Sequence, residues 1–297
     1  MGLAAIFGMP AVRREQFGRW AKGERGVDAV HHYHALQACW PYLSAGRQKV
    51  LDIGPEPSAW LRTLRHFAGE KHELWSCRQG ASPDGTDAGG PAPDGARLMP
   101  AEFDLWSPLA DYEAPTGLAD KGFTLVTLLQ VIDHLYHPEP LFRTLTSVMA
   151  PRAVLVITAS NVGRMANLRG LLRGGGLAGD LDALIGRRGK YPRPRVREYC
   201  WRELTRAALA AGLTPVRHGF YDDPARREAS DFDEPLRNAV APILSEHGQL
   251  QSDMILVFRK AGAVSVGLHR MRRGVYPLLR EAHAKLEAAR RRFRKRR

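Results

Sequence analysis

The stretch Val50-Leu51-Asp52-Ile53-Gly54-Pro55-Glu56-Pro57-Ser58 decides the expected fold. It begins as a short apolar run with a β-branched residue, which is typical of a buried strand. Gly54 then permits a backbone bend that a Cβ would obstruct, and Ser58 can cap a helix that begins at Ala59. A strand, a tight turn and a helix form the unit with which a doubly wound α/β sheet binds nucleotide-like ligands. The stretch therefore predicts a cofactor cleft.

Further apolar runs predict the rest of the sheet. Strands are expected at residues 73–77, 101–105, 122–129, 153–158 and 253–259, and helices at 10–48, 140–149 and 201–211, the last ended by Gly212. Residues 79–97 are rich in Gly, Pro and Asp and are expected to form a surface loop. Because strands alternate with helices, we expect an α/β fold with a doubly wound, mostly parallel sheet.

Composition and charge describe a globular chain with a basic tail. The 297 residues are 44% hydrophobic and 25% charged, which is enough for a large core. Most of the net charge of +13 comes from residues 259–297, which hold fourteen Lys or Arg and two Glu. Residues 275–293 fit a basic amphipathic helix, which favours an anionic membrane surface, with RNA or an acidic polymer as alternatives. A tail that only solubilises the chain is a further alternative.

Cysteine and histidine spacing gives no sign of a metal site. Cys39, Cys77 and Cys200 lie far apart, without the spacing of a zinc site or a disulfide framework, which favours a reducing cytoplasm. His31, His32 and His34 precede the first strand without a matching acid or Cys, so we interpret them as surface or lid residues and expect no metal. No secretory signal and no membrane-spanning segment is recognisable, so the expected location is cytoplasmic, with the tail at the inner face of the membrane as an option.

The opening stretch resembles the first motif of class I S-adenosylmethionine-dependent methyltransferases, in which an apolar pair and an acid precede three alternate glycines. Here Asp52 is the acid and Gly54 the first glycine, while Glu56 and Ser58 replace the second and third. The likeness to the small-molecule and glycan-modifying branch covers about residues 45–260 and continues through Asp133-His134, Pro138, Thr158-Ala159-Ser160-Asn161, Arg197-Glu198-Tyr199, Glu203-Leu204 and Ala211-Gly212-Leu213.

This resemblance implies a seven-stranded, Rossmann-like sheet and S-adenosylmethionine as the cofactor. The implied cofactor-binding residues are Asp52, Gly54, Pro55, Glu56, Ser58, Asp104, Leu105 and Gln130. His134 is the candidate catalytic base, because imidazole titrates near neutrality, and a histidine that ties its loop to the backbone is the alternative. Asn161, Arg197 and Tyr199 are candidate substrate-binding residues, next to an insertion at 163–196 that is expected to shape the acceptor pocket.

The implied organisation is an N-terminal helical lid (1–46), a methyltransferase-like domain (47–260) and a basic amphipathic tail (261–297). The implied reaction moves a methyl group to an oxygen, or a nitrogen, of a small molecule or a cell-surface glycan precursor. The loss of two glycines also fits a catalytically inactive methyltransferase-like protein that binds or acts as a scaffold. A nucleic-acid methyltransferase rests on charge alone, because no base-flipping signature is present, and we expect no dedicated nucleic-acid site in the domain.

Overall fold

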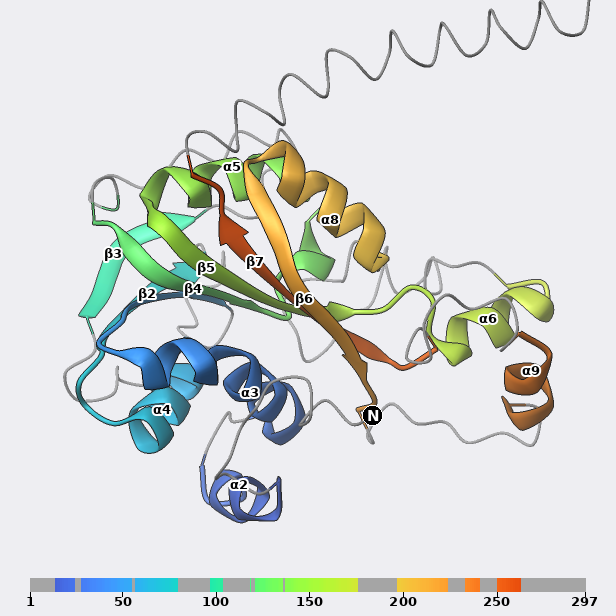
Figure 1. Cartoon of the computed structure of the whole chain (residues 1–297). Helices are drawn as coiled ribbons and strands as arrows, with labels where there is room; N and C mark the ends of the chain where they lie inside the picture. The colour runs from blue at the N-terminus through green and yellow to red at the C-terminus, as the bar shows by residue number, and fades with distance from the viewer. Residues whose placement is uncertain are drawn as a thin grey trace, which may run out of the picture. The chain divides into compact units, whose positions relative to one another are not determined.

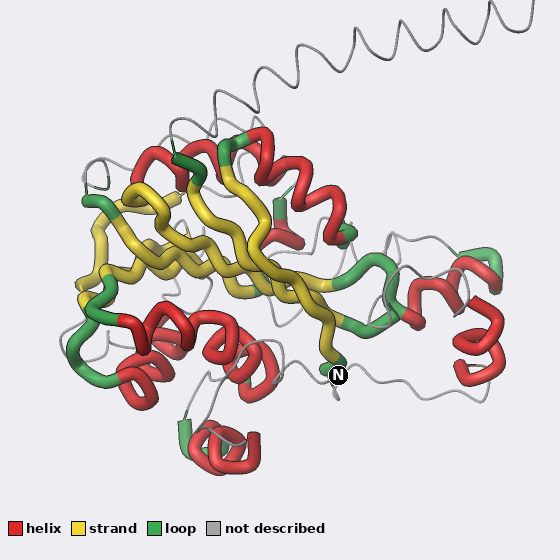
Figure 2. The backbone as a smooth tube through the Cα atoms, viewed as in Figure 1, coloured by secondary structure: helices red, strands yellow, loops and turns green. Residues whose placement is uncertain are grey.

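The computed structural model describes residues 14–24, 28–54, 57–79, 97–103, 118, 121–135, 137–175, 197–223, 233–240 and 250–262. A seven-stranded sheet with the order β3-β2-β1-β4-β5-β7-β6 forms its centre (Figures 1 and 2). The strands are β1 (Lys49–Gly54), β2 (Glu73–Gln79), β3 (Arg97–Phe103), β4 (Phe123–Leu129), β5 (Met149–Ser160), β6 (Leu213–Tyr221) and β7 (Asp253–Lys260). Only β7 runs antiparallel to its neighbours, so the predicted α/β class with a mostly parallel sheet is confirmed.

Helices cover both faces of the sheet (Figure 1). One face carries α3 (Ala29–Ala45) and α4 (Pro57–Ala68), with α2 (Arg14–Ala21) outside them, and the other carries α5 (Pro138–Val148) and α8 (Trp201–Ala210). A short 3-10 turn, η1 (Ile132–His134), follows β4. Beyond one end of the sheet, α6 (Met165–Leu172) and α9 (Asp233–Val240) lie next to each other.

The strands feed two separate cores because successive side chains point to opposite faces. On β1, Leu51 and Ile53 join the core beneath α5 and α8, whereas Val50 joins the core beneath α3 and α4. Asp52 alternates with its neighbours and therefore shares the α3 and α4 side with Val50. The central strands are buried on both faces, which explains their almost unbroken apolar sequences.

Helix α3 is a core element, which corrects our interpretation of its histidines. His31, His32 and His34 are at most 8% exposed, so they are neither surface residues nor exposed lid residues. The helix packs against β4, β5 and β7 on one side and against α2 and α4 on the others. Two of these polar side chains have partners: His34 Nδ1 lies 3.1 Å from Gln37 Oε1, and His31 Nδ1 lies 2.7 Å from the Tyr221 hydroxyl. His32 Nδ1, in contrast, is buried without a hydrogen-bond partner among the described residues.

Several elements differ from the sequence prediction. The helix expected at 10–48 is two helices, α2 and α3, because a turn at residues 22–24 ends the first. Strand β5 begins at Met149 and not at 153, and helices α6 and α9 were not predicted. Helix α4 begins at Pro57, so Ser58 lies inside its first turn and does not cap it; proline suits a first helical position because it lacks an N–H. Strand β3 lies at Arg97–Phe103, four residues before the expected start. Strand β6 was not predicted at all.

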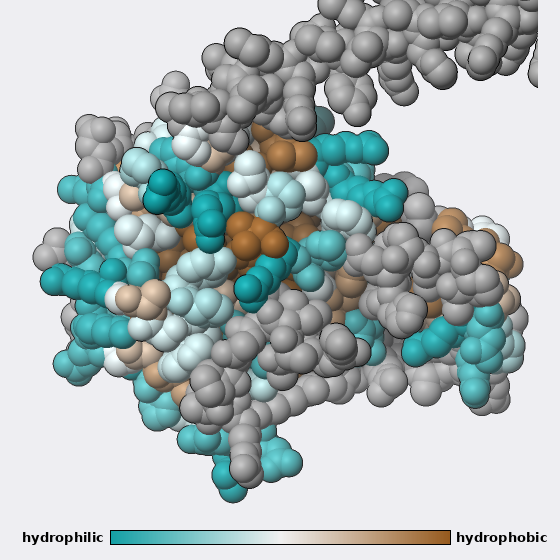
Figure 3. Space-filling model, viewed as in Figure 1, coloured by the Kyte–Doolittle hydropathy of each residue, from teal (hydrophilic) through white to brown (hydrophobic). Residues whose placement is uncertain are grey.

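The compact unit that holds the sheet spans Met1–Lys260. Of the predicted basic tail, only Ala261 and Gly262 are among the described residues, and most of the insertion at 163–196 also falls outside them. The visible described surface is largely hydrophilic in Figure 3, with apolar side chains showing in the middle of the view, over the sheet, and over α6, which carries the exposed Leu171 and Leu172. Among the described residues, no helix combines the length and the hydropathy that crossing a membrane requires.

Candidate functional site

The strand order reverses between β1 and β4. From β1 the chain passes outward through β2 and β3 and then returns to β4 on the other side of β1. Such a topological switch point, at the carboxyl ends of the strands, is where open α/β sheets bind their ligands. Gly54 is the last residue of β1, and Gln130 follows the last residue of β4. The two predicted residues therefore lie at the two strands that bound the switch point.

Gly54 is not required by the local backbone. A Cβ added there would lie 3.8 Å from Asp52 Oδ2 and 4.0 Å from the Leu129 carbonyl oxygen, which are ordinary van der Waals distances. Its backbone is also outside the left-handed region. The prediction that a Cβ would obstruct the bend is therefore wrong for the described chain. What the glycine leaves is room for a methyl-sized group beside Asp52 Oδ2 and the Leu129 carbonyl.

Asp52 is a buried carboxyl group in β1, next to Gly54. It is 2% exposed, and the Thr127 hydroxyl donates to its Oδ1 at 2.6 Å. Burial raises the pKa of Asp52 from 3.8 to about 7, and the hydrogen bond from Thr127 opposes part of that rise. The indole Nε1 of Trp60 in turn donates to Thr127 Oγ1 at 3.1 Å. A chain of hydrogen bonds thus joins α4 to β4 and to the end of β1.

Gln130 adopts a strained conformation directly after β4, at the switch point. Its φ of 57° lies in the left-handed region, which costs a residue with a Cβ about 1–2 kcal/mol. Its backbone N–H donates to Thr158, with 3.0 Å to the carbonyl oxygen and 3.1 Å to Oγ1, and its side-chain amide lies 3.2 Å from His31 Nδ1. Non-glycine residues held in this region cluster at functional sites. The strain therefore favours a ligand-binding role for Gln130.

The acid–histidine pair after β4 has one clearly structural member. Asp133 is buried, and its Oδ2 accepts a hydrogen bond from the Ser160 N–H at 3.0 Å, which ties η1 to the end of β5. The backbone N–H of His134 donates to the Val131 carbonyl at 3.1 Å, and its side chain is partly exposed. The assignment of His134 as the base stays a prediction.

The three candidate substrate-binding residues make contacts within the protein. Asn161 donates from Nδ2 to the Gln251 carbonyl at 2.9 Å and accepts at Oδ1 from the Gly163 N–H at 3.0 Å. The Tyr199 hydroxyl donates to the Leu135 carbonyl. The Arg197 guanidinium lies over the Tyr199 ring, 4.4 Å from its centroid. These contacts fasten the segment after β5 to the segment before β7, and the segment before α8 to the residue that follows η1. A role toward substrate stays a prediction.

Four predicted cofactor residues lie outside the described part of the chain: Pro55, Glu56, Asp104 and Leu105. The backbone of Ser58 belongs to α4, but its side chain is not described.

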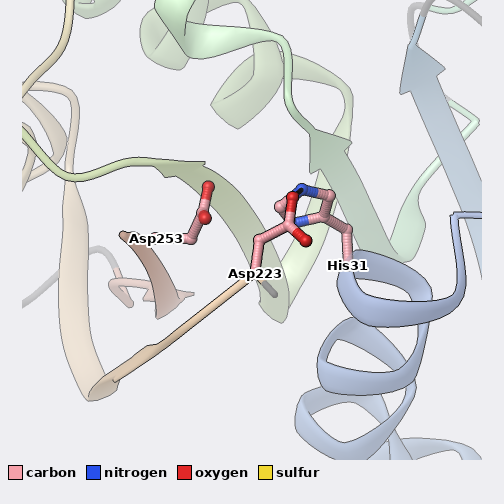
Figure 4. A group of neighbouring side chains, drawn as sticks. All are labelled: His31, Asp223 and Asp253. Carbon is pink, nitrogen blue, oxygen red and sulfur yellow. Dashed lines mark ion pairs between the residues drawn. The ribbon is translucent and has the colours of Figure 1, made fainter. Parts of the chain in front are cut away.

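The structure also assembles polar residues that the sequence did not suggest. His31 from α3, Asp223 after β6 and Asp253 at the start of β7 bring potential ligand atoms within 4.8 Å of one another (Figure 4). His31 is 2%, Asp223 9% and Asp253 0% exposed. The acids lie more than 190 positions after the histidine, so only the course of β6 and β7 could have linked them. The pair Asp222-Asp223, at the end of the unpredicted strand β6, was the one sign in the sequence that carboxylates follow that strand.

No protein-family model and no curated protein matches this sequence. Among solved structures, the chain is similar to a Haloferax volcanii structure of the Trm112 methyltransferase activator in complex with a methyltransferase, with 14% identity, a TM-score of 0.49, and 84% of this chain and 97% of that chain covered. It is also similar to a SAM-dependent methyltransferase from Archaeoglobus fulgidus (17% identity, TM-score 0.47, 82% and 99% covered). A third is a SAM-dependent methyltransferase from Aquifex aeolicus (11% identity, TM-score 0.45, 84% and 100% covered).

Proposed function

We propose that the chain binds S-adenosylmethionine at the switch point between β1 and β4 and transfers its methyl group to an oxygen or nitrogen of a small molecule or glycan precursor. The observation that carries the proposal is Gly54, whose missing Cβ leaves space beside the Leu129 carbonyl although the backbone does not require glycine. The order of methyltransferase-like motifs along residues 45–260 supports the same ligand. The cofactor supplies an electrophilic methyl group.

The described residues suit a cationic ligand of this kind. Asp52 places a carboxyl group next to the opening at Gly54, where its charged form would attract the ammonium or sulfonium of the cofactor. Gln130 offers an amide and a strained backbone on the opposite strand. Methyl transfer needs the nucleophile, the methyl carbon and the sulfur in line, so positioning by these residues can suffice, with His134 as the candidate base.

Calorimetric titration with S-adenosylmethionine and S-adenosylhomocysteine tests the proposal. We expect saturable binding to the wild-type chain and at least a tenfold loss of affinity in Gly54→Ala, because the new methyl group occupies the opening. The thermal stability of Gly54→Ala should not fall, since its Cβ meets only van der Waals contacts.

Gly46→Ala is the matched control for this titration. Gly46 follows α3 in extended backbone, with nothing within 4 Å of an added Cβ, so its replacement should leave affinity unchanged. Absence of binding to the wild-type chain at millimolar ligand would refute the proposed cofactor.

A catalytically inactive binding or scaffold protein is the second candidate function. Glu56 and Ser58 favour it, because they replace the second and third glycines of the motif. Mass spectrometry of the purified chain separates the two functions: bound cofactor together with methylated product in a lysate supports catalysis, whereas bound cofactor without any product supports the scaffold. We further propose a cytoplasmic location, with the basic tail in contact with an anionic surface such as the inner face of the membrane.

A further inference from the structure

His31, Asp223 and Asp253 form a cluster of ligand-type side chains at the carboxyl edge of the sheet (Figure 4). They come from three distant segments, and all three are at most 9% exposed. Their ligand atoms lie within 4.8 Å of one another, close to the roughly 4 Å that separates atoms on opposite sides of an ion bound at about 2 Å. Small side-chain rotations would therefore bring one nitrogen and two oxygens to a common ion.

The hydrogen bonds around the cluster orient the imidazole for this role. His31 Nδ1 lies 2.7 Å from the Tyr221 hydroxyl, while Nε2 lies 3.9 Å from Asp223 Oδ2. A ligating histidine usually donates its other ring N–H to an oxygen, which fixes the tautomer. With Nδ1–H donating to Tyr221, Nε2 carries the lone pair that an ion would take, and Asp28 Oδ2 at 3.7 Å lies about as near to it as Asp223 Oδ2. The amide of Gln130, also near Nδ1, can present its oxygen there by a half-turn.

Ser252 orients the two acids in the same way. Its hydroxyl donates to Asp253 Oδ2 at 2.6 Å and accepts from the Asp223 N–H at 2.8 Å. One side chain therefore fixes the position of both carboxylate-bearing residues, as outer hydrogen bonds do around bound metal ions.

We infer that His31, Asp223 and Asp253 bind a divalent first-row transition ion, such as Mn²⁺ or Zn²⁺. Carboxylates alone would suit Mg²⁺ or Ca²⁺, but imidazole shifts the preference toward transition ions. The bound ion would join the start of α3 to the end of β6 and the start of β7. This inference stands apart from the proposed methyl transfer, because it needs neither cofactor nor acceptor.

Metal binding to the chelator-stripped full-length chain tests the inference. We expect one Mn²⁺ per chain by electron paramagnetic resonance, tighter binding of Zn²⁺ in competition, and at least tenfold weaker binding of Mg²⁺. Each ion that binds should raise the melting temperature of the chain, since it binds the folded state. Asp253→Asn and Asp223→Asn should each weaken Mn²⁺ binding at least tenfold.

Asp222→Asn is the matched control, because it removes one negative charge next to the cluster without removing a ligand. Asp222 Oδ1 accepts from the Ser252 N–H at 3.2 Å, which an asparagine oxygen can also do. We expect its Mn²⁺ affinity to stay within threefold of wild type. The inference would be overturned if Asp222→Asn, Asp223→Asn and Asp253→Asn weakened Mn²⁺ binding equally, or if the wild-type chain bound no Mn²⁺.

Two further measurements keep the outcome clear. Circular dichroism of the ion-free variants shows whether they fold. If a ligand variant fails to fold, Ser252→Ala replaces it in the test, because it keeps all three ligands. We expect Ser252→Ala to weaken Mn²⁺ binding, by a smaller factor than the loss of a ligand. Titration of the same samples with S-adenosylhomocysteine reports separately on the proposed cofactor site.

Discussion

At the scale of single residues, Asp52 makes the clearest contribution to pH dependence. Its pKa rises from 3.8 to about 7 because the folded protein buries it. The folded state then holds a proton that the unfolded state releases, so stability falls as pH rises from about 4 to 7. Between these two pKa values the free energy of unfolding falls by about 4 kcal/mol at most, at roughly 1.4 kcal/mol for each pH unit.

Asp52→Asn should remove this dependence, because an amide does not ionise and can still accept from Thr127. Urea unfolding of both chains at intervals between pH 4.5 and 8 measures the effect. We expect the variant to gain stability relative to wild type as pH rises, with the gain levelling off above pH 7. A difference that does not change with pH would show that Asp52 is not buried as described.

Gln130 allows a second test at the same scale, of backbone strain. At a φ of 57°, glycine is favoured over alanine, so Gln130→Gly should be more stable than Gln130→Ala by about 1 kcal/mol. Both variants lose the contact with His31, so their difference isolates the backbone. The control is Ala150→Gly in β5, where φ is not positive and glycine should destabilise. Guanidinium unfolding measures the stability of the wild-type chain and the three variants. If glycine were less stable than alanine at position 130, as it should be at position 150, the backbone strain at Gln130 would be contradicted.

At the scale of elements, the hydrogen-bond chain from Trp60 through Thr127 joins α4 to the central strands. Trp60→Phe keeps a buried ring but removes the indole donor, and Thr127→Val removes the acceptor, so each should cost about 1–2 kcal/mol. Because the two side chains contact each other, the double variant should be less destabilised than the sum by about 1 kcal/mol. Chemical unfolding of all four chains measures this coupling.

Ser147→Ala is the control for the coupling. Ser147 lies on α5, on the other face of the sheet, where its hydroxyl donates to the Thr144 carbonyl at 2.7 Å. Combined with Trp60→Phe it should be additive within about 0.5 kcal/mol. Additivity in both cycles would show that the indole does not bond Thr127 in solution.

The same scale explains which elements the sequence could predict. Strands β1, β4, β5 and β7 are buried on both faces, so their apolar runs were visible, and with them Asp52, Gly54 and Gln130 at their ends. Strand β6 lies at the edge of the sheet, where Pro215, Arg217 and His218 are tolerated and interrupt the apolar pattern. Without β6, nothing in the sequence placed Asp223 near His31, because that contact depends on tertiary packing alone.

At the scale of the whole molecule, most of the positive charge lies in a different part of the sequence from the sheet. Residues 263–297 carry twelve Lys or Arg and two Glu, so most of the net charge of +13 lies beyond the compact unit Met1–Lys260. A chain of residues 1–262 should therefore melt within about 2 °C of the full chain and bind S-adenosylhomocysteine equally well.

The same truncation tests what the tail binds. The full chain should sediment with vesicles that contain 30% phosphatidylserine, because each cation near such a surface contributes about 1 kcal/mol. The bound fraction should drop at least tenfold between 50 and 500 mM salt, since screening shortens the range of the attraction. Neutral phosphatidylcholine vesicles are the control, and residues 1–262 should bind neither kind.

Two outcomes would contradict this assignment. Salt-sensitive binding that persists in residues 1–262 would place the anion site on the folded domain. Binding of the full chain to RNA but not to vesicles would make a nucleic acid, and not the membrane, the partner of the tail.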